Sequence, residues 1–223
     1  MSLTARLRAT LRPTHDRLEE LPLTRAMSDG RLPRPLYQRL LAELSHLHEP
    51  FEAELGRRPE WAGLYRPEMA RAGLLRRDRA ALGPDPEQTG PMPATRQLAE
   101  HVRLWGRDRP WALLGVLYVL EGSRMGSALM AGKLAGCLGV PCEPGRGLDY
   151  HLDGGAERPK RWQRFKADLD DAPLSPAQQD DVVAAASEAM DRIHELYAQL
   201  SAVLGPLSVV LPATDQGQRT KDN

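Results

Sequence analysis

Apolar positions are densest between Pro110 and Gly136. Pro110 can open a helix there, because the first turn of a helix does not need the N–H that proline lacks. The residues that follow are apolar nearly all round, a pattern that predicts a helix buried inside the protein. The run approaches the length of a membrane span, but it contains Glu121, Arg124 and Lys133, and such charges are costly in lipid. We therefore expect a buried helix in a protein without a membrane anchor.

Two glycines of this helix, Gly122 and Gly126, lie four residues apart and therefore on one face. Each costs about 1 kcal/mol relative to alanine in a helix interior, so the pair needs an explanation. One explanation is close packing against another helix, which small residues at this spacing often allow. The other is a flat or bulky ligand that lies against the bare backbone. The spacing alone leaves both explanations open.

The N-terminal segment 3–22 also has a helical pattern, and Pro13 is a point where this helix must kink or restart. At 100° per residue, four polar residues fall within an arc of roughly 60° on the helix. They are Arg8, Arg12, His15 and Glu19. Polar stripes are typical of solvent-exposed faces, and a kink at Pro13 would rotate the arginines relative to the histidine. The stripe is therefore either a solvated surface or one side of a binding site.

Five further segments are predicted to be helical from their periodicity and composition, namely 34–55, 68–82, 94–105, 160–166 and 176–204. Ser175 and Pro176 are a typical start for the last of these helices, as its cap and its first residue. Segments 83–93 and 139–155 are rich in glycine and proline, and we predict that they are loops.

Composition and charge exclude several classes of protein. The 223 residues include 30 basic and 30 acidic ones, so the net charge gives no indication of nucleic-acid binding. Cys137 and Cys142 are too few for a disulfide scaffold and form no metal-ligand pattern. The N-terminus lacks the apolar run of a signal peptide, so a cytoplasmic protein is expected. Strand patterns are scarce, and the chain is expected to form one all-α domain over 1–210 with a polar, disordered tail at 211–223.

The sequence contains no motif that would supply catalysis from side chains alone. His46 and His48 lie two apart on a predicted helix, so they face different ways and do not form a paired metal site. The phosphate-binding G-x-x-x-x-G-K, the G-x-S-x-G elbow and the Rossmann glycine pattern are all missing. Any chemistry would therefore depend on a borrowed cofactor.

Two separated patches resemble the heme oxygenase family. The first reads Leu-Arg-Pro-Thr-His-Asp-Arg-Leu-Glu over 11–19. Together with Pro-Leu at 22–23 and Gly-Arg-Leu at 30–32, it is similar to the N-terminus of these enzymes. The second reads Leu-Tyr-Val-Leu-Glu-Gly-Ser-Arg-Met-Gly over 117–126 and looks like the distal helix of the bacterial branch. Segment 161–169 and the long final helix follow in the order that the family has. The resemblance covers most of residues 3–204.

The resemblance implies an all-α fold with heme between a proximal and a distal helix. His15 would be the proximal iron ligand, and Glu19 would neighbour it and hold the imidazole. Gly122 and Gly126 would let the distal backbone come close to the porphyrin. These implied roles fit the chemistry, since neutral imidazole binds iron and an exposed glycine face suits a flat macrocycle.

The resemblance also assigns basic residues to the heme propionates. Arg8 and Arg12 match positions at which the family places basic residues, and guanidinium groups suit carboxylates. Arg164 and Lys166, within the basic segment 160–166, are candidates for the other propionate contacts.

The implied activity is O₂-dependent cleavage of heme to biliverdin, carbon monoxide and ferrous iron. Heme would be both cofactor and substrate, and electrons would come from a ferredoxin-type or NADPH-dependent reductase. The chain departs from mammalian relatives at two positions of the water network that delivers protons. Ser123 stands where they carry an aspartate, and His48 stands where they carry a tyrosine. We expect Ser123 to hold a water and His48 to relay protons with a pKa near neutrality. The alternative is that His48 is only a packed or solvated helix residue.

Two other functions are considered beside this one. A fold relative that binds two metals or a thiamine fragment is disfavoured, because no matching set of Glu, His and Asp ligands is evident. A heme carrier or sensor would share His15 and the glycines but would not turn over. The sequence does not separate such a carrier from an oxygenase.

Overall fold

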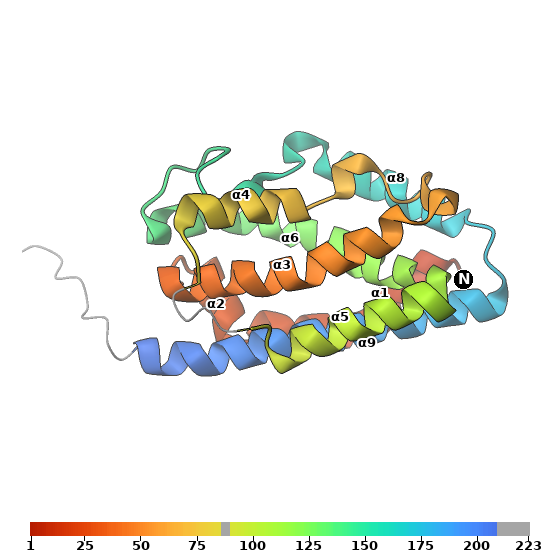
Figure 1. Ribbon diagram of the computed structural model, residues 1–223, viewed down its shortest axis with the longest axis horizontal. Helices are drawn as coiled ribbons and strands as arrows, with labels where there is room; N and C mark the ends of the chain where they lie inside the picture. Colours follow the sequence, from red (N-terminus) through yellow and green to blue (C-terminus); the bar gives the residue numbers. More distant parts are fainter. Residues whose placement is uncertain (86–89, 209–223) are drawn as a thin grey trace, which may run out of the picture.

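The computed structural model describes residues 1–85 and 90–208, and every regular element within these ranges is a helix (Figure 1). The predicted all-α fold is therefore confirmed. The tail predicted at 211–223, together with the domain boundary predicted at 210, lies outside the described residues.

Within residues 1–85 and 90–108, the chain forms five α-helices. Ser2 caps the first of them, because its hydroxyl oxygen accepts the N–H of Ala5 at 3.4 Å. Two single turns of 3₁₀ helix, η1 (Pro59–Trp61) and η2 (Pro67–Met69), connect the third and the fourth. The five are α1 (Leu3–Glu20), α2 (Pro22–Ser28), α3 (Arg34–Gly56), α4 (Ala72–Leu82) and α5 (Pro93–Asp108).

The second half begins with η3 (Pro110–Ala112), a turn of 3₁₀ helix that leads into α6. α6 ends at Gly139, whose φ of 65° is the left-handed conformation that terminates many helices. Ser175 caps the last helix as predicted, and its hydroxyl accepts the N–H of Gln178 at 3.3 Å. The elements are α6 (Leu113–Leu138), α7 (Asp149–Leu152), η4 (Gly155–Glu157), α8 (Arg158–Asp170) and α9 (Pro176–Ser208).

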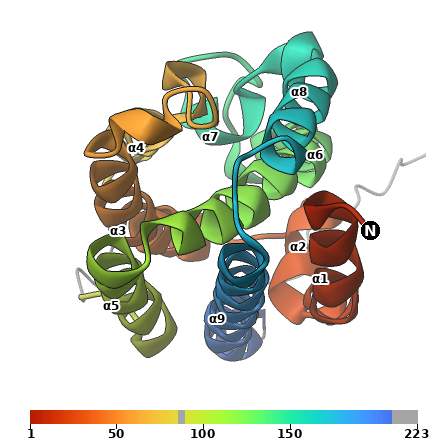
Figure 2. The ribbon, with the colours of Figure 1, turned by 90° about the vertical axis from the view of Figure 1, so that its right-hand side faces the viewer.

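α6 is the central helix of the fold. When the molecule is viewed along its long axis, α6 runs through the middle and the other helices lie around it (Figure 2). Its first part, Leu113–Leu120, is buried throughout, as the apolar pattern predicted. α9 packs against α1, α5 and α6. The contact with α6 depends on Gly115, because a Cβ at that position would lie 2.1 Å from the carbonyl oxygen of Val182.

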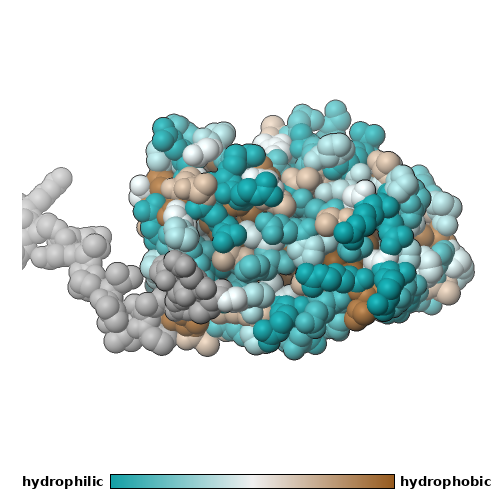
Figure 3. Space-filling model, viewed as in Figure 1, coloured by the Kyte–Doolittle hydropathy of each residue, from teal (hydrophilic) through white to brown (hydrophobic). Residues whose placement is uncertain are grey.

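The surface is largely polar on the side drawn in Figure 3, where hydrophobic residues are scattered among hydrophilic ones. Among the described residues, the exposed large hydrophobic side chains are Met1, Leu104 and Leu129, which belong to different helices or to the N-terminus. Within the part of the chain that the structure describes, no helix has both the length and the apolar character to cross a bilayer.

Candidate functional site

A cavity of about 550 Å³ lies between α1 and α6 and extends to α7, α8 and α9. Its volume is in the range of small-molecule and cofactor sites, about 300–1,000 Å³. α1 lines it with the polar stripe recognised in the sequence, and α6 lines it with glycine and serine residues. The inner end is formed by Tyr150 and His151 of α7 together with Tyr197 of α9. The cavity thus joins the N-terminal helix to a part of α6 that is remote from it in sequence.

The glycines of α6 have two different roles. A Cβ built on Gly126 would meet no atom within 4 Å, and one built on Gly122 would meet only the ring of Trp162, at 3.6 Å. Both positions line the cavity, so their bare backbone faces open space. Gly115, about two turns before Gly122 in the same helix, is the glycine that packs against α9. The structure therefore favours the ligand-face explanation for Gly122 and Gly126 over helix packing.

The polar stripe of α1 faces the cavity as a single surface. α1 continues through Pro13 without a break, so the arginines and His15 stay on one side. The side chain of His15 is 54% exposed, and its Nδ1 lies 3.7 Å from Oε1 of Glu19 and 3.9 Å from Oδ1 of Asp16. Both distances are too long for hydrogen bonds. The imidazole is therefore free to bind a ligand through either nitrogen.

The arginines of the stripe lie at the edge of the same cavity. Arg8 and Arg12 both line it, and Arg12 is 74% exposed, with its Nε 3.7 Å from Oδ2 of Asp16. An exposed pair at this separation stabilises the fold little. These guanidinium groups are consequently available to an anionic group of a ligand.

The inner wall is built from hydrogen-bonded, buried groups. Tyr150 lines the cavity, and its hydroxyl lies 3.4 Å from Nε2 of His48, which is 2% exposed. Nδ1 of His48 lies 3.2 Å from Oε1 of Glu52, and this oxygen also accepts the backbone N–H of Arg71 at 2.7 Å. A carboxylate only accepts, so Nδ1 carries the proton and Nε2 accepts from the tyrosine hydroxyl.

The surroundings of His48 shift its pKa downward. Burial lowers the pKa of His48, the hydrogen bond with Glu52 opposes this shift, and the positive charge of Arg71 adds to the lowering. Burial raises the pKa of Glu52, but hydrogen bonds from His48 and from backbone N–H groups outweigh it and lower that pKa overall. We predicted a pKa near neutrality for His48, but burial lowers it. The sequence alone did not reveal that this histidine is buried.

His151 is a second buried histidine on the inner wall. It is 3% exposed, and its Nδ1 lies 2.6 Å from the hydroxyl of Ser127 on α6. Nε2 is buried and has no hydrogen-bond partner among the described residues. Burial lowers the pKa of His151 to about 3, and the charge of Arg71 contributes to the lowering. The ring is therefore neutral, with one nitrogen held and the other unused.

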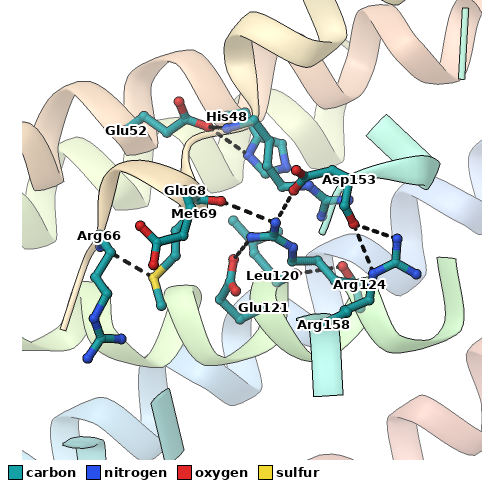
Figure 4. A network of polar contacts seen from close by, with 12 residues as sticks. His48, Glu52, Arg66, Glu68, Met69, Leu120, Glu121, Arg124, Asp153 and Arg158 are labelled. Atoms are coloured by element: carbon teal, nitrogen blue, oxygen red, sulfur yellow. Dashed lines mark hydrogen bonds and ion pairs between the residues drawn. The ribbon is translucent and has the colours of Figure 1, made fainter. Parts of the chain in front are cut away.

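A network of buried charges holds the segment around α7 to α6 (Figure 4). Arg124 of α6 donates to Oε1 of Glu121 at 2.8 Å and pairs with Asp153. Nε of Arg158 donates to the carbonyl oxygen of Asp153 at 3.0 Å. Burial raises the pKa of Glu121, although the positive charge of Arg124 acts in the opposite direction. Glu121 and Arg124, two of the three charged residues that interrupt the apolar run in the sequence, belong to this network.

Four of the predicted site residues are placed differently from what we expected. Ser123 lines the cavity, but its hydroxyl donates to the carbonyl oxygen of Leu120 in its own helix at 2.7 Å. His48 lies behind Tyr150 and is not among the described residues that line the cavity. Arg164 and Lys166 are likewise not among them. Arg164 is exposed, and Nζ of Lys166 lies 5.4 Å from the centre of the ring of Trp162, a residue of α8 that lines the cavity.

No group of three or more His, Cys, Asp or Glu side chains within 1–85 and 90–208 is arranged to hold a metal ion. What the cavity offers are single imidazoles, His15 from α1 and His151 from α7.

The family model described as heme oxygenase matches residues 1–199. The chain belongs to the heme oxygenase family. The heme oxygenase of Xanthomonas campestris pv. campestris is 26% identical over 181 residues, which cover 79% of this chain and 97% of the relative. Heme oxygenase 1 of Rattus norvegicus is 24% identical over 209 residues, or 91% of this chain and 72% of the relative.

Solved structures of heme oxygenases share the fold. That of Leptospira interrogans superimposes with a TM-score of 0.81 at 22% identity, covering 89% of this chain and 100% of the other. Heme oxygenase-2 of Synechocystis, in complex with heme and NO, gives a TM-score of 0.84 at 20% identity, covering 93% of this chain and 88% of the other. The family predicted from the two sequence patches is confirmed, and so is the single-domain heme oxygenase fold.

Sequence reasoning missed the inner wall of this family member's cavity. Residues 139–155 were predicted to be a loop, but they contain α7, which carries Tyr150 and His151. Four residues are too few for a helical periodicity to be recognised, so only the fold reveals this helix.

Proposed function

We propose that the chain binds heme in this cavity and cleaves it with O₂ to biliverdin, carbon monoxide and ferrous iron. The observation that carries the proposal is that His15 on α1 and the bare backbone of Gly122 and Gly126 on α6 line one cavity. Membership of the heme oxygenase family supports it, as does the heme in the Synechocystis structure of the same fold.

The residues of the cavity fit a heme. His15 has no hydrogen-bond partner among the described residues, so its ring is available to iron. The empty space beside Gly126 gives room for a flat ring. Arg8 and Arg12 at the edge of the cavity present guanidinium groups, which pair well with carboxylates such as propionates.

Heme, when bound, would supply the iron at which O₂ is activated and the macrocycle that is cleaved. The chain would hold and orient it. Glu19, 3.7 Å from Nδ1 of His15, can accept the proton on that nitrogen after a small movement, which would fix the tautomer and make the opposite nitrogen the ligand. Electrons would come from an external reductase of the ferredoxin or NADPH-dependent type.

Proton supply is the second task of the chain's own residues. We propose that the route runs through Tyr150, whose hydroxyl at the cavity wall reaches Nε2 of His48. Glu52 holds the far side of the same imidazole. The hydroxyl of Ser123 donates its proton within α6, which leaves its lone pairs to accept a hydrogen bond from a water in the cavity. Tyr150 therefore connects His48 to the cavity that Ser123 also lines.

One experiment tests the proposed activity. Hemin is added to the purified protein with a reductant under air, and the Soret band is followed together with the absorption of biliverdin. We expect the Soret band to decay while biliverdin and carbon monoxide appear. A stable Soret band under the same conditions, with heme firmly bound, would indicate a carrier or sensor instead. Failure to bind hemin at all would contradict both functions.

A further inference from the structure

α7 is a helix that does not provide for its own stability. It spans only the four residues Asp149–Leu152, and the residue before it, Leu148, has no side chain that can cap it. A helix of one turn is unstable alone, because the first turn orders several residues for a single hydrogen bond. Yet α7 carries both Tyr150 and His151. Something outside the helix must hold it.

The outside partner is Asp78 of α4. Its side chain is 0% exposed, and its two carboxylate oxygens accept the first two N–H groups of α7. Oδ1 accepts the N–H of Asp149 at 2.7 Å, and Oδ2 accepts the N–H of Tyr150 at 2.8 Å. Free N–H groups at a helix start are normally satisfied by the residue just before the helix. Here a carboxylate from another helix does this.

The carbonyl side of α7 is held by two arginines. Nη2 of Arg71, a residue 1% exposed, donates to the carbonyl oxygen of Tyr150 at 2.7 Å, and its guanidinium lies 3.6 Å from the centre of the Tyr150 ring. Nη2 of Arg158 donates to the carbonyl oxygen of His151 at 2.8 Å. Asp78 accepts N–H groups of α7 and the two arginines donate to its carbonyl oxygens, so both kinds of backbone group in this helix have partners from outside it.

We propose that Asp78 is a positioning residue, which caps α7 from α4 and thereby places Tyr150 against His48 and His151 against Ser127. Its meaning for catalysis rests on the proposed function, whereas the placement itself does not. Burial of a carboxylate is costly, and burial raises the pKa of Asp78 to about 6. A serine or threonine before α7 would cap the helix without that cost. The carboxylate does more, because it binds two amides at once and connects α7 to α4.

The test uses the full-length, heme-free protein labelled with ¹⁵N at histidine. Asp78→Asn keeps the shape of the side chain but replaces one acceptor oxygen with an amide that cannot accept an N–H. We expect the ring nitrogen signals of His151, assigned by their loss in His151→Gln, to move toward the average of the two tautomers as the Ser127 hydrogen bond is lost. Signals of His151 unchanged in a folded Asp78→Asn protein would overturn the proposal.

Asp85→Asn is the matched control. Asp85 is also buried, at 5% exposure, and its Oδ2 accepts from Nη1 of Arg39 on α3 at 2.7 Å. We expect this variant to lower the melting temperature while the His151 signals stay as they are. Equal changes of the His151 signals in both variants would mean that any loss of stability disturbs α7, and would also overturn the proposal.

A measurement on the unmodified protein covers the case in which Asp78→Asn does not fold. The amide protons of Asp149 and Tyr150 should exchange with solvent far more slowly than that of Gly147 in the preceding loop. Equally fast exchange would contradict the cap. Hemin titration of the unmodified protein is a separate arm: without heme binding the proposed function fails, while the NMR and exchange results still decide the role of Asp78.

Discussion

Two walls of the cavity are built in opposite ways: the α1 wall, which carries Arg8, Arg12 and His15, and the inner wall around Tyr150 and His151, called the α7 wall below. On the α1 side, His15 and Arg12 are 54% and 74% exposed, and their nearest charged neighbours lie beyond hydrogen-bonding distance. On the α7 side, His151 is 3% exposed, and His48 of α3, which lies behind Tyr150, is 2% exposed; each has a nitrogen held by a neighbouring side chain. The first wall is a set of free side chains, and the second is a fixed arrangement.

The difference shows how the two walls would treat a ligand. Free side chains on α1 must be ordered when a ligand binds, which costs roughly 0.5–1.5 kcal/mol for each long side chain but lets the wall adapt. The groups on the α7 wall are already oriented by burial and by the backbone contacts of α7, so they need no reorganisation. Binding is thus expected to depend on α1, and the control of reactivity on α7.

The largest expected effect is on the α1 wall. His15→Ala should abolish the native heme spectrum, because the proposal makes this imidazole the only protein ligand to iron. Added imidazole should restore the spectrum, since it can enter the space that the side chain leaves. His101→Ala, on α5 outside the cavity, is the control and should bind heme normally. An unaltered spectrum in His15→Ala would sink the assignment.

The next effect separates the two kinds of glycine on α6. Gly126→Leu should leave helicity and melting temperature nearly unchanged, because a Cβ there meets nothing within 4 Å, but it should strongly weaken hemin binding. Gly132→Leu, which also meets nothing within 4 Å, is the control outside the cavity. Gly115→Ala should instead destabilise the fold, because its Cβ would lie 2.1 Å from a carbonyl of α9. Circular dichroism and hemin titration distinguish these outcomes.

The α7 wall should be visible in the acid stability of the heme-free protein. The pKa of His151 is about 3 in the folded state and about 6.5 in the unfolded state, so the unfolded chain binds more protons between these values. This contribution to the free energy of unfolding is complete above pH 6.5 and falls by up to about 1.4 kcal/mol per pH unit as the pH decreases. His151→Gln should flatten that slope in urea titrations. An identical slope in the variant would contradict a buried, neutral His151.

Removing residues of the proposed proton route should slow biliverdin formation and leave hemin binding intact. His48→Phe combined with Ser123→Ala should slow biliverdin formation by about 100-fold, the lower end of general acid–base effects. Hemin affinity should stay the same, because neither residue is proposed to hold heme. Each single variant serves as a control, and Tyr150→Phe should resemble His48→Phe, since the hydroxyl joins His48 to the cavity. Full yield at the normal rate from the double variant would show that solvent carries the protons.

The smallest effect should come from the exposed arginines. Arg8→Glu with Arg12→Glu should weaken heme binding by roughly 1–3 kcal/mol, toward the lower end because these side chains are solvated. Added salt should reduce the difference, since it screens exposed charges. Arg164→Glu with Lys166→Glu makes the same charge change on α8, outside the cavity, and should alter the affinity far less. Equal affinity of the unmodified protein for heme and for its dimethyl ester would rule the clamp out.

The sequence by itself determined the long helices and the family. Apolar periodicity is local, so the buried helix at 110–136 and the long helix after Ser175 could be recognised from neighbouring residues alone. The 3.6-residue repeat likewise predicted that His15 and the arginines of α1 share a face. The roles of these side chains stay predictions, but their common surface is present in the fold.

The tertiary structure alone decided the α7 wall and the meaning of each glycine. Tyr150 and His151 are adjacent to His48 and Ser127 only after α3, α6 and α7 have packed together. Gly115 and Gly126 look alike in sequence, and only the position of α9 makes one a packing site and leaves the other open. The physical reason is that burial and contacts between distant segments depend on the whole packed core, whereas helix formation depends mainly on residues within a few turns of each other.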